Sequence, residues 1–172
     1  MTRTALFIAA ASALSIAGPA FAAAPTDPQI AHIAYTAGTL DIAAAKQALK
    51  MSHNKAVRDF AQEMARDHKA VNDKALALVK KLHVTPEGNP TSSALTKAAD
   101  TERSKLAKLK GAAFDREYVK NEVAYHQTVN DALSSTLIPS AHNGELKSLL
   151  ETGLKLFKEH QAHAEQLAAK VK

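Results

Sequence analysis

Residues 57–82, VRDFAQEMARDHKAVNDKALALVKKL, decide the fold of this chain. Apolar side chains recur in this stretch every three or four positions, which is the period of one face of an α-helix. His68 falls on the same face, between Met64 and Val71, while most of the charged residues fall elsewhere. The pattern therefore predicts a long amphipathic helix that buries one face.

The chain on either side of this helix has the same character. Alanine, leucine and lysine are abundant, and no hairpin dipeptide separates alternating apolar stretches. Breakers at 52–54, 85–90, 111 and 138–144 divide the chain into five predicted helices, at about 28–51, 54–83, 92–109, 112–137 and 143–170. We expect an all-α fold, a four-helix bundle with a short extra helix in the long connection between its second and third bundle helices.

Two connections in this bundle are short and one is long. The short ones predict antiparallel hairpins, formed by the first two and the last two helices. The long one can either cross the length of the bundle, which gives an up-down-down-up order, or cap one end of it. The sequence leaves both alternatives open.

The N-terminus has the features of an export signal. Arg3 provides a positive start, residues 5–17 are apolar, and small residues follow up to Ala24. We expect a signal peptide over 1–22, with a cut after Ala22 or alternatively after Ala24, and a single domain over 26–172. No stretch of the mature chain reaches the ~20 apolar residues of a membrane helix, so we expect a soluble protein of the periplasm, or a secreted one.

Composition excludes several classes of function. The chain has no cysteine, which rules out a lipid-modified N-terminus, disulfides and thiolate metal sites. A net charge of +5 without a basic stripe, and 5% aromatic residues, argue against nucleic acid as a partner. No phosphate loop, nucleophile elbow or zinc-protease motif is present, so we expect no enzyme activity. A protein partner or a homo-oligomer stays open.

Ionisable residues interrupt the apolar faces of the four bundle helices, one or two in each. They are Asp41, His68, Glu122 with His126, and His160. At ~1.5 Å per residue, all of them lie roughly 18 to 30 Å from the turn of their own hairpin, so we expect one internal polar layer. Asp115, Tyr118 and His163 lie on or beside the same faces and are expected around it, whereas Glu63 and Asp67 are expected on a solvated face.

Such a layer has two interpretations. Buried ionised groups are costly unless they are paired or bind a metal ion. Three imidazoles and one or two carboxylates suit a transition metal, with His68, His126, His160, Glu122 and Asp41 as candidate ligands. Alternatively, the layer is a hydrogen-bonded structural feature that fixes the register of the helices.

Several of these residues belong to longer motifs. These are FAQEMARDH at 60–68 with Asn72, AFDREY at 113–118 with His126, and Glu159-His160 before Gln166. In these motifs the chain resembles a bacterial exported family known as domain of unknown function 4142, over about residues 28–167. The resemblance implies a ferritin-like bundle in the up-down-down-up order, and it carries no settled activity.

Ferritin-like proteins often hold two iron ions with a pair of Glu-x-x-His motifs. Here Ala65, Val123 and Phe157 stand three residues before His68, His126 and His160. A di-iron site is therefore not expected. The function predicted from sequence is that of a non-enzymatic periplasmic bundle, structural, stress-related or partner-binding. The alternative is a mononuclear, histidine-rich metal-binding or redox protein.

Overall fold

A computed structural model describes residues 24–171 of the chain, and the predicted signal peptide over 1–22 lies outside the described residues. The described part is helical and contains no strand. Its long helices are α1 (Asp27–Met51), α2 (Lys55–Lys81), α3 (Pro90–Leu106), α4 (Gly111–Ala132) and α6 (Gly144–Ala168). The five predicted helices are confirmed, with ends that differ by a few residues.

Polar residues start the helices where the sequence has breakers. The side chain of Asn54 accepts hydrogen bonds from the N–H groups of Ala56 and Val57, and Asn143 does the same for the first turn of α6. Asn89 and Ser92 cap the start of α3 reciprocally. These caps satisfy backbone donors that have no partner inside the helix.

The end of α4 differs from the prediction. Helical structure continues beyond residue 137 through a π-helical turn (η1, Leu133–Leu137) into a three-residue helix (α5, Ile138–Ser140), and the chain leaves the helix only at Ala141. Pro139 lies in this last helical stretch, where it has no N–H to donate to the preceding turn, and the helix ends two residues later.

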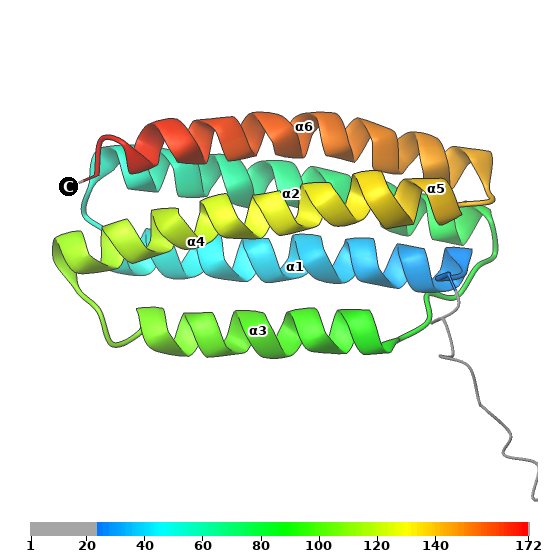
Figure 1. The fold of residues 1–172 in the computed structure, drawn as a ribbon, viewed down its shortest axis with the longest axis horizontal. Helices are drawn as coiled ribbons and strands as arrows, with labels where there is room; N and C mark the ends of the chain where they lie inside the picture. Colours follow the sequence, from blue (N-terminus) through cyan, green and yellow to red (C-terminus); the bar gives the residue numbers. More distant parts are fainter. Residues whose placement is uncertain (1–23, 172) are drawn as a thin grey trace, which may run out of the picture.

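The helices form a four-helix bundle with α3 outside it (Figure 1). α1 and α2 form one antiparallel hairpin, and α4 and α6 form the other. α3 runs along the outside of α1 for most of its length and returns the chain to the end where α2 began. α2 and α4 are therefore parallel, which gives the up-down-down-up order, and the capping alternative is wrong.

The apolar core is divided into two clusters along the bundle axis. One cluster contains Val57, Phe60, Met64, Leu106, Phe114 and Tyr118, all fully buried, near the α1–α2 turn. The other contains Ile30, Ile33, Leu133, Leu137, Leu146, Leu150 and Phe157, near the opposite end. In every bundle helix, the residues between the two clusters are the polar ones singled out above.

No helix among the described residues combines the length and apolar character that crossing a membrane requires.

Candidate metal centre

The five candidate ligands come together in the middle of the bundle. Asp41 is contributed by α1, His68 by α2, Glu122 and His126 by α4, and His160 by α6. Each of these residues is at most 2% exposed. The polar layer predicted from helix periodicity is therefore present, and all four bundle helices contribute to it.

Besides a half-buried group of Glu63, Asp67 and His160, two fully buried groups of three ligand atoms can be distinguished, within each of which all atoms lie within 4.8 Å of one another. The first consists of His68, His126 and His160, and the second of Asp41, Glu122 and His126. The Nε2 atoms of His68 and His126 are 3.4 Å apart. The Oδ2 atom of Asp41 lies 3.6 Å from Nε2 of His68 and 3.8 Å from Nε2 of His126. Asp41 thus joins the imidazole group.

Hydrogen bonds outside the cluster orient two of the imidazoles. Nδ1 of His126 lies 2.9 Å from the backbone carbonyl oxygen of Glu122, to which it can only donate. Its Nε2 therefore directs a lone pair at His68 and Asp41. Nε2 of His160 lies 3.2 Å from Oδ2 of Asp67, and donation there leaves Nδ1 with a lone pair. A metal-binding histidine commonly donates its second N–H to a carbonyl or a carboxylate in this way.

Several buried polar atoms of the cluster have no hydrogen-bond partner in the protein. They include both carboxylate oxygens of Asp41, Nδ1 of His68, Oε2 of Glu122 and Nδ1 of His160. A buried polar group without a partner is uncommon and costly. All four bundle helices therefore contribute buried polar atoms without a protein partner to the residues of this cluster.

Burial also sets the charge of the cluster. Loss of hydration lowers the pKa of His68 to about 3 and that of His126 to about 4, so both imidazoles are neutral at neutral pH. Loss of hydration raises the pKa of Asp41, and nearby His126 and His160 oppose this rise. The pKa of Glu122 is raised well above its ordinary value, first by burial and then by the neighbouring charge of Asp41. The site thus contains two neutral imidazoles, those of His68 and His126, beside two buried carboxyl groups.

Packing fixes the positions of the ligands. The ring of Phe157 stacks on that of His68, with ring centroids 4.6 Å apart and planes 10° from parallel. The hydroxyl of Tyr125 donates to the carbonyl of Ala37 across the α1–α4 contact, at 2.8 Å. These contacts hold the helix faces that carry the ligands in register.

Asp67 and Glu63 were expected on a solvated face, and that prediction is wrong. Asp67, only 18% exposed in its side chain, bonds His160 and also pairs with Arg66 through two nitrogen–oxygen contacts of 2.7 and 3.0 Å. Oε2 of Glu63 lies 2.8 Å from Nδ1 of His163. Both carboxylates lie at the edge of the α2 face that meets α6. The helical period of the sequence places both residues beside the apolar face of α2 and cannot show their contacts with α6. Those contacts depend on how α2 and α6 are rotated against each other.

The three residues expected around the layer lie in different places. Tyr118 is fully buried next to Glu122, and burial raises the pKa of its phenol. Asp115 is buried on the same helix but stands seven residues before Glu122, about 10 Å away along the axis. His163 is exposed and lies edge-on to Phe60, with centroids 5.1 Å apart. Only Tyr118 borders the cluster directly.

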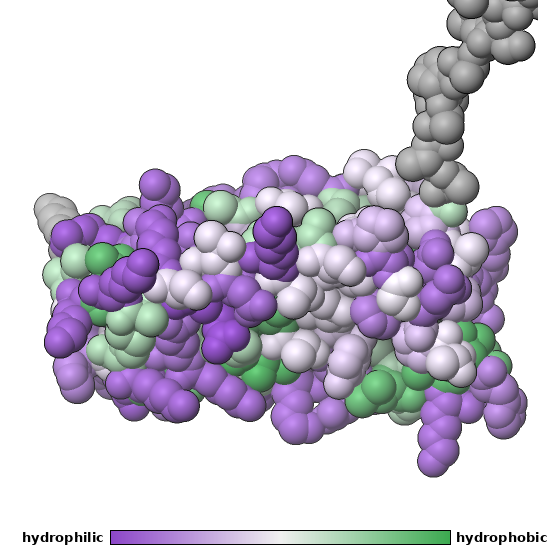
Figure 2. Space-filling view, turned by 90° about the horizontal axis from the view of Figure 1, so that it is seen from below, coloured by the Kyte–Doolittle hydropathy of each residue, from purple (hydrophilic) through white to green (hydrophobic). Residues whose placement is uncertain are grey.

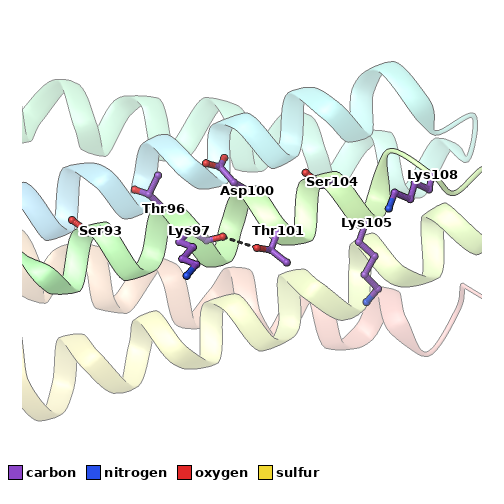
Figure 3. A pocket seen from close by; sticks show the side chains of 8 residues that line it. All are labelled: Ser93, Thr96, Lys97, Asp100, Thr101, Ser104, Lys105 and Lys108. Atoms are coloured by element: carbon purple, nitrogen blue, oxygen red, sulfur yellow. Dashed lines mark hydrogen bonds between the residues drawn. The ribbon is translucent and has the colours of Figure 1, made fainter.

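A separate depression runs along the outer face of α3 (Figure 3). Side chains of α3 and of the turn that follows it line the depression and point outward into solvent: Ser93, Thr96, Lys97, Asp100, Thr101, Ser104, Lys105 and Lys108. It brings no side chains from different elements together. The buried cluster is the stronger candidate site.

Comparison with known proteins gives a family and a fold. The model of the family described as "Domain of unknown function (DUF4142)" matches residues 12–167. No curated protein matches the chain. Among solved structures, a crystal structure described as "putative secreted protein DUF305 from Streptomyces coelicolor" is similar, with a TM-score of 0.70 and 12% identity. The match covers 83% of this chain and 91% of the other, and at this identity it shows the fold alone.

Proposed function

Because the chain belongs to the DUF4142 family, whose description assigns no activity, we propose its function from the buried cluster: it binds one transition-metal ion through His68, His126, His160 and Asp41. The observation that carries this proposal is the convergence of buried ligand atoms from four helices, with the three imidazoles within 4.8 Å of one another and Asp41 beside two of them.

The spacing of the atoms supports a single ion. With metal–nitrogen bonds of about 2.0–2.1 Å, two ligands of a tetrahedral site are about 3.4 Å apart. The two Nε2 atoms of His68 and His126 have this separation, and Asp41 lies only slightly farther from each. Three imidazoles and a carboxylate suit zinc, copper, nickel or iron in the divalent state.

The charge of the cluster supports a cation. Asp41 and Glu122 are buried, no Lys or Arg among the described residues forms an ion pair with them, and burial raises the pKa of both. A divalent ion provides the missing positive charge and favours the ionised form of Asp41. Metal uptake should therefore release protons.

A full set of four protein ligands supports a storing or buffering role rather than catalysis. Four protein ligands fill a tetrahedral site, whereas catalytic zinc sites keep one position open for water or substrate. Although Asp41 and Glu122 also line a pocket of about 300 Å³ between α1, α3 and α4, the three imidazoles do not line it, and each candidate ligand is almost fully buried. This agrees with the lack of catalytic motifs in the sequence.

Export and superfamily are part of the proposal. The N-terminal pattern of a positive start, an apolar stretch and small residues supports a cleaved signal peptide and a periplasmic or secreted protein. The description of the similar Streptomyces coelicolor protein as secreted supports the same location. The up-down-down-up bundle supports a place among ferritin-like folds, although the paired Glu-x-x-His motifs of di-iron proteins are missing.

Metal titration of the mature, untagged chain after treatment with a chelator tests the proposal. We expect about one equivalent of zinc or copper by elemental analysis, a rise in melting temperature, and nitrogen or oxygen neighbours at about 2.0–2.1 Å by X-ray absorption. His68→Gln and His160→Gln should each abolish stoichiometric uptake. His53→Gln, which changes an exposed histidine near the α1–α2 turn, is the matched control.

A structural polar layer would give a different result. Folded wild-type protein would then take up less than about a tenth of an equivalent of every metal tested, and added metal would not stabilise it. Either outcome is visible in the wild-type protein, so the test does not depend on how well the variants fold.

Asp67 provides a finer test, as a residue that positions a ligand. Asp67→Asn keeps the size of the side chain and weakens its ability to accept from His160, so we expect metal affinity to fall about 10- to 100-fold with unchanged stoichiometry. Asp73→Asn is the matched control, since Asp73 lies on the same helix and pairs only with Lys69 at the surface. Equal metal affinities of Asp67→Asn and Asp73→Asn would show that Asp67 does not position His160 for metal binding.

A further inference from the structure

The half of the bundle that contains the beginning of α1 has a large internal cavity. Its volume is about 800 Å³, and α1, α2, α3, α4, η1 and α6 all contribute to its walls. Protein cores contain few voids larger than a water molecule, whereas sites for small ligands measure ~300–1,000 Å³. The size of this cavity is typical of a ligand site.

Small residues on facing helices create the space. Ala31, Ala34 and Ala37 line the cavity from α1, Ala75 lines it from α2, and Gly153 lines it from α6. The larger residues that enclose it are leucine, isoleucine, valine and Phe157. None of the described residues in its lining is charged, and the polar ones are uncharged amides and threonines. The cavity is suited to an apolar molecule.

The length of the cavity limits the type of molecule. On α6 its lining extends from Leu146 to Phe157, about 16 Å along the helix axis. One acyl chain in a bilayer spans about half of the ~30 Å hydrocarbon core, which is nearly the same length. Phe157 closes the inner end, where its other face stacks on His68. The cavity is thus separated from the candidate metal centre by one aromatic ring.

The rim is open and uncharged. Thr26, Thr91 and Thr136 line the cavity and are exposed, and they come from the start of α1, from α3 and from η1. On the face seen in Figure 2, an apolar patch lies toward the end of the molecule where α1 begins. A head group at this rim would face water and meet no fixed charge among the described lining residues.

From these observations we propose that the cavity binds one acyl chain of medium length, with the tail directed toward Phe157 and the head group at the threonine rim. The affinity comes from burial of the apolar tail, which is proportional to the area removed from water. The identity of the head group contributes little, because no charged side chain lines the cavity. Binding does not require the metal ion.

Calorimetry on the mature chain, with 1-dodecanol and dodecanoate as probes below their aggregation limits, tests this proposal. We expect one molecule per chain and affinities for the two probes within about fivefold of each other. Ala34→Phe fills the cavity and should weaken both at least about tenfold. Ala70→Phe adds the same ring on the exposed face of α2 and should leave binding unchanged.

Photolabelling of the wild-type protein locates the site without any variant. A dodecanol that carries a diazirine near its tail end should label the inner walls, within residues 31–37 of α1 or 146–157 of α6. No binding by the wild-type chain, binding of dodecanoate alone, unchanged binding by folded Ala34→Phe, or labels confined to other segments would each overturn the proposal.

Discussion

The two halves of the bundle are built from the same kinds of residues but are packed differently. Around the α1–α2 turn, Phe60, Leu106, Phe114 and Tyr118 fill the interior and are fully buried, and the rings of Phe114 and Tyr118 lie stacked. In the opposite half, alanines and a glycine face one another around the cavity. The polar cluster lies between the halves. The close-packed half therefore fixes the positions of the ligand-bearing helices, while the cavity in the other half leaves space for a bound molecule.

Truncation of one leucine in each half should show the largest effect. We expect Leu106→Ala to lower the free energy of unfolding by about 4–5 kcal/mol, because it leaves a new cavity in dense packing. Leu150→Ala, next to the existing cavity, should lower it by about 2–3 kcal/mol, since this side chain has fewer close neighbours to lose. Urea unfolding with unchanged m-values measures both.

Leu76→Ala is the control for these truncations, because Leu76 is 45% exposed and should change stability by less than about 0.5 kcal/mol. Equal losses for Leu106→Ala and Leu150→Ala would show that the two halves are packed alike, which would remove the basis of the comparison.

Stability measured at several pH values tests whether water is excluded from the polar cluster as it is from the close-packed half. The folded-state pKa of Glu122 is raised, so this group costs the metal-free protein stability as pH rises from about 4.5 toward its folded value. Glu122→Gln removes this cost. The variant should therefore gain stability over the wild type as pH rises above about 4.5, with a slope that approaches about 1.4 kcal/mol per pH unit below the raised folded-state pKa.

Denaturant unfolding at several pH values, with a chelator present, measures this difference. Glu159→Gln, on the exposed face of α6 next to His160, should give a curve parallel to that of the wild type. If the stability of Glu122→Gln also runs parallel to that of the wild type over the pH series, water reaches Glu122 in the polar cluster.

A smaller effect is expected where α1 and α2 approach closely beside the cavity. A Cβ atom on Gly38 would lie 2.3 Å from Oδ1 of Asn72, whose amide nitrogen donates to the carbonyl of Tyr35 and to Thr39. Gly38→Ala must displace Asn72 and break these bonds, but the hollow half gives the side chain room to move. We expect a loss of about 1–2 kcal/mol in thermal or urea unfolding.

Gly144→Ala is the matched control, because a Cβ atom there meets nothing within 4 Å. It should raise stability by about 0.5 kcal/mol, because alanine reduces the conformational entropy of the unfolded chain. A loss above about 3 kcal/mol for Gly38→Ala would show that the hollow half is as rigid as the other one.

The site illustrates how far periodicity reaches. The positions of Asp41, His68, Glu122, His126 and His160 on their helix faces follow from the repeat of ~3.6 residues, and their common level follows from the helix rise and the turn positions. The role of Asp67 does not follow from either. Its contact with His160 joins residues 93 positions apart and depends on the rotation of α2 against α6.

By itself, the sequence determined the five helices, their approximate ends, the faces they bury and the polar residues on those faces. These features depend on neighbours within one or two helical turns, so they are encoded locally. Only the tertiary structure decided the path of α3 along α1, the imidazole nitrogens that face inward, and the cavity next to Phe157. Each of these depends on how side chains from distant segments fit together, and that fit is a property of the packed bundle as a whole.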